Sequence, residues 1–137
     1  MATNERAEMI FLAIAESGYA FTIKSEGSSL ATFQKIVDGN VDVVTTRHAG
    51  LPHTFDLWVN DEGLYRNDFI TNLVASHLTG TVLVGPAVMS NVNINTGETT
   101  GLTSTDLKSL SSIMEIDTNF GNHYTVDEAA YWMKAVA

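Results

Sequence analysis

Glycine and proline divide this chain into short apolar segments, and that punctuation limits what it can fold into. Breaks fall at Gly18, Gly39, Gly80 and the pair Gly85-Pro86. The first apolar run covers only residues 9–15, whereas a membrane-spanning helix needs ~20 residues. We therefore expect short helices and strands packed around a core, with no membrane segment.

Four segments rich in β-branched and aromatic residues are predicted to form strands. In the third of them, Phe55, Leu57 and Val59 alternate with other residues and should share one face. Trp58 should face the other way. The predicted strands cover residues 19–24, 40–47, 55–60 and 81–84.

Helix signals come from capping residues and from apolar side chains spaced three and four apart. Two capping boxes, Thr103 with Asp106 and Thr125 with Glu128, should begin the last two helices. The predicted helices lie between the turn at residues 26–29 and Gly39, from Asn67 or Asp68 through Leu78, from Thr103 to about Met114, and from Thr125 onwards.

The first 18 residues fit two interpretations. Asn4 is a good helix cap, and a helix from there would run to Ser17 and end at Gly18. The apolar residues are consecutive, however, which also fits a buried strand over residues 10–15. Both interpretations stay open from the sequence.

These elements favour an α+β fold, because helices and strands are mixed rather than strictly alternating. We expect a small, mostly antiparallel sheet with helices packed on it and two C-terminal helices. The Thr- and Asn-rich residues 91–101 should form a loop or an exposed hairpin. The 137 residues match the size of a single domain, residues 1–137.

Several motifs go beyond general pattern. Leu30-Ala-Thr-Phe33-Gln-Lys-Ile36-Val37-Asp-Gly39-Asn-Val41-Asp42-Val43 is followed by Leu57-Trp-Val59-Asn60-Asp61-Glu62-Gly63-Leu64, by Asn67, and by Gly80-Thr-Val82-Leu-Val84-Gly85. Over residues 19–86 the chain resembles a family of small phage and plasmid proteins catalogued as domain of unknown function 3846. The resemblance implies a mobile-element origin and a compact α+β fold, with residues 19–86 as the family-like core. The residue patterns described above then make residues 87–137 a polar loop or hairpin plus two helices. It implies no established activity and no catalytic residue. The chain departs from the family's pattern at Asp61, where the family tends to have Glu.

The most concentrated polar group is Asn60-Asp61-Glu62-Gly63. Asn, Asp and Gly are what a tight turn requires, and Gly63 would supply a positive φ. Alternatively, two carboxylates and an amide at the end of a strand could bind a cation or an arginine of a partner. This turn is therefore a candidate site.

Aromatic residues dominate binding hot spots, and Trp58 is the preferred candidate because it faces away from its strand's apolar side. Other aromatic candidates are Tyr65, Tyr124, Tyr131 and Trp132. An alternative function is a binding protein that sequesters a small molecule such as a nucleotide, with Trp58 stacking on it. His48, His53 and the turn at residues 60–63 would then give polar contacts, while Arg47 and Arg66 would hold the anion.

A third hypothesis is a metal-assisted hydrolase that uses His48, His53 and Asp56 around a proline-containing loop. The chain has no cysteine, and its histidines lack the spacing of a zinc motif. We therefore expect no metal and no cofactor. His77 falls on the apolar stripe of its predicted helix and should be packed.

The acidic charge is concentrated in the second half of the chain. The net charge is −9, and residues 51–137 hold ten Asp and Glu against three Lys and Arg. Direct binding to nucleic acid depends on Lys and Arg, so it is not expected. An acidic surface can imitate nucleic acid and bind a basic groove on another protein, or it can simply keep the protein soluble. The leading hypothesis is a non-enzymatic phage accessory protein that binds and modulates a host protein in the host cytoplasm.

The last two predicted helices also suggest self-association. Only 17% of the residues are charged. If residues up to Val84 already complete a core, these amphipathic helices need another surface. A homodimer or a higher oligomer would cover them. The alternative is that both helices fold back onto their own sheet.

Overall fold

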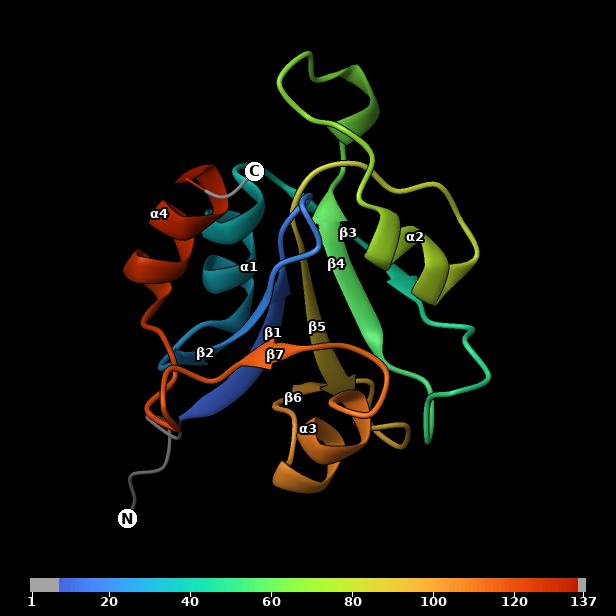
Figure 1. Ribbon diagram of the computed structural model, residues 1–137, viewed down its shortest axis with the longest axis vertical. Helices are drawn as coiled ribbons and strands as arrows, with labels where there is room; N and C mark the ends of the chain where they lie inside the picture. The colour runs from blue at the N-terminus through green and yellow to red at the C-terminus, as the bar shows by residue number, and fades with distance from the viewer. Residues whose placement is uncertain (1–7, 136–137) are drawn as a thin grey trace.

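A central sheet with helices on both faces makes up the fold (Figure 1). The computed structural model describes residues 8–135. The strand order is β3-β4-β5-β1-β2-β7, and β6 pairs with β5. The strands are β1 Met9–Ile14, β2 Ala20–Ser25, β3 Val41–Thr45, β4 Asp56–Asn60, β5 Ala87–Val92, β6 Thr99–Thr100 and β7 Ile116–Asp117. The helices are α1 Ser29–Val37, α2 Leu73–Thr79, α3 Ser104–Leu110 and α4 Val126–Ala135, with a 3-10 turn, η2, at Gly63–Tyr65.

The α+β class is confirmed, and the sheet is mixed rather than mostly antiparallel. Antiparallel ladders join β1 to β2, β1 to β5, β3 to β4, β4 to β5 and β5 to β6. β7 pairs parallel to β2, with Ala20 opposite Ile116. The sequence prediction missed β7 because a strand of two residues carries no periodic pattern. Its pairing places a parallel ladder at one edge of the sheet.

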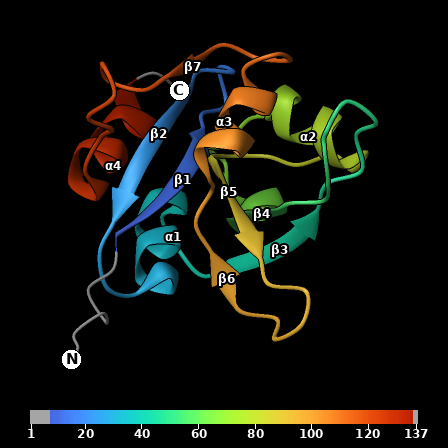
Figure 2. The ribbon, with the colours of Figure 1, turned by 90° about the horizontal axis from the view of Figure 1, so that it is seen from below.

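Alternating side chains divide the core into two layers. In β1, Leu12 and Ile14 face the layer that α2 and α3 cover, whereas Phe11 and Ala13 face α1 and α4. Figure 2 shows these two pairs of helices on opposite sides of the sheet. Burial on both faces explains why the apolar residues of β1 are consecutive.

The strand interpretation of residues 10–15 is therefore confirmed. A helix running to Ser17 is wrong over Met9–Ile14, because these residues pair with β2 and β5. Asn4, its predicted cap, lies outside the described residues.

The strand predicted over residues 81–84 is wrong, and the central strand β5 lies just beyond it. Residues 81–84 form only an isolated bridge, between Thr71 and Val84, and Val82 is 67% exposed. Gly85, with φ +81°, turns the chain so that the buried strand begins after Pro86. The sequence interpretation treated Gly85-Pro86 as the end of a strand, whereas the pair precedes one.

Helix α2 begins later than predicted, at Leu73 rather than after Asn67 or Asp68. Its cap is the buried Asn72, whose Oδ1 accepts from Ala75 N at 3.0 Å. The helix buries Ala75 and Leu78 instead of the predicted stripe. His77, predicted to be packed, is exposed.

Both C-terminal capping boxes are confirmed, and both helices fold back onto the sheet. Leu110 of α3 is buried in one core layer, while Ala129 and Met133 of α4 are buried in the other. The core is therefore not complete at Val84. The hairpin alternative for residues 91–101 is also confirmed, since β5 and β6 pair there. None of the described helices is long and apolar enough to cross a membrane.

Candidate functional site

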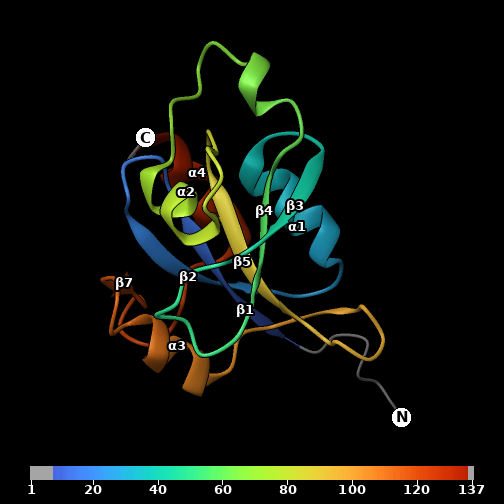
Figure 3. The same cartoon turned by 90° about the vertical axis from the view of Figure 1, so that its right-hand side faces the viewer.

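The segment between β4 and α2 projects from the body of the molecule (Figures 1 and 3). We call residues 61–69 the projecting loop. At η2 it presents Leu64, which is 76% exposed, and Tyr65, which is 87% exposed. The loop includes most of the polar turn that the sequence marked as a candidate site.

Asn60 fixes the beginning of the projecting loop. Its Nδ2 donates to the carbonyl oxygens of Val37 and Asp38, each at 3.1 Å, and its Oδ1 accepts from Glu62 N at 2.8 Å. This buried amide therefore ties the loop to the end of α1. A turn at residues 61–62 follows, as predicted.

Gly63 does not have the predicted positive φ. Its role is to leave space: a Cβ at this position would lie 3.0 Å from Val84 Cγ2. Glycine therefore suits this position because a side chain would crowd the segment before β5, and not because of its backbone conformation.

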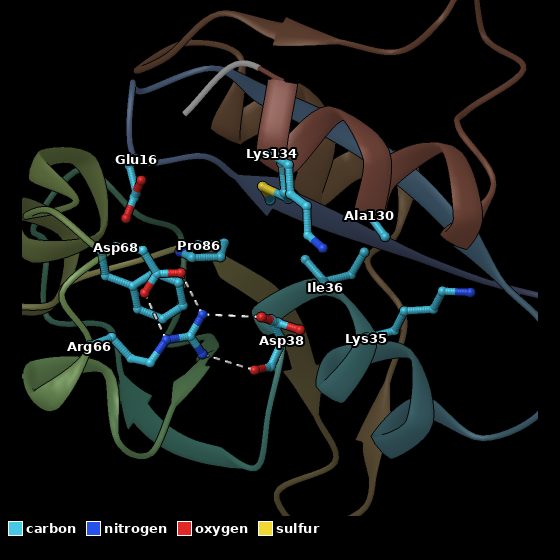
Figure 4. A pocket seen from close by; sticks show the side chains of 11 residues that line it. Glu16, Lys35, Ile36, Asp38, Arg66, Asp68, Pro86, Ala130 and Lys134 are labelled. Atoms are coloured by element: carbon cyan, nitrogen blue, oxygen red, sulfur yellow. Dashed lines mark hydrogen bonds and ion pairs between the residues drawn. The ribbon is translucent and has the colours of Figure 1, made fainter.

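Arg66 fixes the other end of the loop (Figure 4). Its Nε and Nη2 donate to the two carboxylate oxygens of Asp68 at 2.8 and 2.7 Å, and Nη2 also donates to Asp38 Oδ2 at 3.1 Å. The guanidinium lies 4.2 Å from the centroid of the Phe69 ring. The hydrogen bonds from Arg66 hold the pKa of Asp68 below its usual range. Arg66 is therefore committed to bracing the loop, which leaves it poorly placed to hold an anionic ligand.

Trp58 lies beneath α1, apart from the loop tip. Its ring stacks on Phe33 with centroids 4.9 Å apart, and its Nε1 donates to Ser90 Oγ at 2.9 Å. Arg47 lies beyond β3, beside a groove of about 460 Å³ that is lined mainly by threonines. The structure thus groups Asn60, Asp61, Glu62 and Arg66 in and around the loop, with Trp58 and Arg47 elsewhere.

The histidines of the hydrolase hypothesis have separate partners. His53 bonds to Asp106 and to the carbonyl of Thr54 through its two ring nitrogens. His48 accepts from Gly50 N, and its ring lies 4.8 Å from that of His77. Burial raises the pKa of Asp56, the third proposed ligand. Within residues 8–135 no three His, Asp or Glu side chains are arranged to hold a metal ion.

One polar cluster was not found from the sequence. Asp117 of β7 accepts hydrogen bonds from the hydroxyls of Tyr19 and Tyr124. These bonds lower the pKa of Asp117, and Asp117 raises the pKa of Tyr124. The cluster ties β7 to the start of β2. It has no local signal, because Tyr19 and Asp117 are far apart in the chain.

A comparison with models of known protein families assigns this chain to a family. The model of the family described as "Domain of unknown function (DUF3846)" matches residues 9–115. The chain belongs to this family. The DUF3846 match extends beyond residues 19–86 at both ends and takes in β1, β5, β6 and α3, while β7 and α4 follow it. No curated protein and no solved structure matches the chain significantly.

Proposed function

We propose that this DUF3846 protein is a non-enzymatic binding protein that attaches to a partner protein through the tip of the projecting loop. The observation that carries the proposal is the exposure of Leu64 and Tyr65 on a loop that is tied to the end of α1 on both sides of its tip, through Asn60 and Arg66. A loop held in one conformation loses little entropy when it binds. A tyrosine at its tip also supplies a large contact area with few rotatable bonds.

Further apolar side chains follow the loop toward α2. Ile70, Leu73 and Val82 are all exposed. Asn72 N donates to Leu83 O at 2.8 Å, so the chain around Leu73 runs beside the chain around Val82. Large exposed apolar patches mark interaction sites on soluble proteins, and these side chains could widen the contact made by the loop tip.

The charge around the tip indicates the chemistry of the partner. Asp61 and Glu62 are exposed directly before η2, and the whole chain carries a net charge of −9. Complementary charge speeds association and selects partners. We therefore expect an apolar pocket bordered by basic side chains on the partner. The proposal includes a phage origin for this chain, which the family resemblance implies. The partner would then be a protein of the host cell.

Site-specific photo-crosslinking tests this proposal in cells of the organism that carries the gene. A photoreactive phenylalanine analogue replaces Tyr65 in one variant and Ile94 in the control. Ile94 is 89% exposed on the β5–β6 hairpin, so both positions reach solvent equally well. The proposal predicts one discrete adduct from position 65 that is lost when Leu64→Ser is added. Identical adducts from both positions, or none from position 65, would overturn it.

A further inference from the structure

A second site lies behind the projecting loop, in a cleft of about 370 Å³ (Figure 4). Its walls come from the β1–β2 turn, the end of α1, the loop at Arg66–Phe69, Pro86 and α4. The apolar part of the lining is formed by Ile36, Phe69, Pro86 and Met133. A cleft of this volume with apolar walls and a few polar groups has the character of a small-molecule site.

Glu16 is the buried polar group of this cleft. It is 9% exposed, and its Oε2 accepts from Ile70 N at 2.8 Å. The other carboxylate oxygen, Oε1, forms no hydrogen bond within residues 8–135. Every side-chain polar atom in these residues that is fully enclosed does have a hydrogen-bond partner. Oε1 is therefore open to solvent, and Figure 4 shows the carboxylate pointing into the cleft. A mostly buried carboxylate with one oxygen facing the cleft can accept a hydrogen bond from a ligand that displaces water there.

The charges around Glu16 favour a cationic donor. Asp38 and Asp68 lie in the same lining and share the single charge of Arg66, so this side of the cleft carries an excess of negative charge. Lys35 also lines the cleft, but its ammonium is paired with Asp127. Lys134 of α4 forms no salt bridge within the described residues. It can therefore receive an anionic group at the opposite wall.

We infer that the cleft binds a small molecule through a primary ammonium group that donates to Glu16 Oε1. This site is separate from the loop tip, so it extends the proposed function and does not depend on it. Two ligand classes share the ammonium: diamines, whose second ammonium would meet the excess negative charge of Asp38 and Asp68, and amino acids, whose carboxylate would reach Lys134. The apolar walls would pack on the carbon chain between the two ends of either ligand.

Amide NMR spectra of the full chain test the inference with three probes of similar length. These are 1,5-diaminopentane, L-lysine and the neutral control 1,5-pentanediol, each added to about 10 mM, which nearly saturates a site with a Kd of about 1 mM. We expect the amines to shift the signals of Ile70 and Met133 and the diol to leave them unchanged. Stronger binding of L-lysine than of the diamine would support an amino acid, and the reverse order would support a diamine.

A matched pair of variants supplies the second arm. Glu16→Gln keeps an acceptor for Ile70 N but removes the charge, and it should weaken amine binding at least tenfold. Glu26→Gln makes the same change on the exposed β2–α1 turn and should bind as the wild type does. Equal shifts from diol and amines, no shift from any probe, or unchanged binding by Glu16→Gln would overturn the inference. Leu64→Ser should leave amine binding intact, which separates this result from the test of the loop tip.

Discussion

His53 Nε2 lies 2.9 Å from Asp106 Oδ1, and this contact joins the loop before β4 to the capping box of α3. The other ring nitrogen, Nδ1, lies 2.9 Å from the carbonyl oxygen of Thr54. Both neighbours accept hydrogen bonds, so a protonated imidazole satisfies both of them. The bond to Asp106 raises the pKa of His53 above its ordinary value of 6.5, although burial opposes the rise.

The raised pKa of His53 predicts a pH-dependent stability. Because the folded pKa exceeds the unfolded one, the stabilisation is complete below the unfolded value of 6.5 and disappears as the pH rises through the folded value. The imidazole is 46% exposed, so we expect a contribution of only about 0.5–1 kcal/mol. Burial raises the pKa of Asp106, but hydrogen bonds from Thr103, His53 and Asn91 lower it by more. The net pKa of Asp106 is therefore below its usual value, and the carboxylate stays ionised while His53 titrates.

Urea unfolding at about pH 5.5 and about pH 8.5 checks this prediction. The stability difference between wild type and His53→Gln should be present at the lower pH and should shrink at the higher one. His77→Gln, which leaves the contact with Asp106 intact, is the control. A difference of the same size at both pH values would contradict the assigned protonation.

Asn60→Ala should both destabilise the protein and loosen the projecting loop. The substitution leaves Glu62 N and two carbonyls without their partner, which should lower the free energy of unfolding by about 2–3 kcal/mol. Hydrogen exchange of residues 61–69 should also become faster than in wild type. Asn95→Ala, an exposed change on the β5–β6 hairpin, should alter neither quantity. Unchanged exchange in Asn60→Ala would show that the amide does not hold the loop.

Gly85→Ala should be far more harmful than Gly97→Ala. Both glycines have a positive φ, of +81° and +77°, so both variants carry a backbone penalty of about 1 kcal/mol. A Cβ at Gly85 would also lie 2.6 Å from the ring of Phe69, whereas a Cβ at Gly97 would meet nothing within 4 Å. We expect an additional loss of about 1–3 kcal/mol for Gly85→Ala. Equal melting temperatures for the two variants would contradict the packing of Phe69 against Gly85.

Self-association stays a prediction, but the surface expected to form the dimer contact changes. The inner faces of the last two helices are covered by the sheet, so only their outer faces are available. α4 covers the sheet with Ala129 and Met133 but leaves Tyr131 67% exposed, beside Trp132. A homodimer would therefore use the outer face of α4, and high salt should strengthen it by screening the charge of −9 on each chain. Light scattering should give twice the chain mass of 14.9 kDa, and Tyr131→Ser should reduce it. A monomer at high salt and high protein concentration would rule the dimer out.

Local features of the fold could be predicted from the sequence, because their partners lie a few residues apart. The cap at Ser28 and the boxes at Thr103 and Thr125 all use an acceptor and a donor three residues away. β5 was missed because its identity as the central strand depends on pairing with β1 and β4. No pattern within residues 81–92 contains that information.

The candidate site was predictable in its position but not in its chemistry. The sequence marked the polar turn and Tyr65 as candidate contacts. It also suggested that Arg66 would hold an anion, but Arg66 pairs with the nearby Asp68 and with Asp38, which only the fold brings beside it. Glu16 gave no signal at all, because its burial depends on the loop before α2 folding over the β1–β2 turn. Contacts between distant segments decided the burial of Glu16 and brought Asp38 to Arg66.

Binding of the purified protein to the partner captured at position 65 tests the central claim most directly. Titration calorimetry would compare wild type, the double variant Leu64→Ser/Tyr65→Ser and the control Ile94→Ser. Because both side chains are exposed, none of these changes should lower the melting temperature. Two truncated anchors should weaken binding by about 2–4 kcal/mol, or about 30-fold or more, while the control binds as wild type does. Equal affinity of the double variant and wild type would contradict the claim that the loop tip carries the interaction.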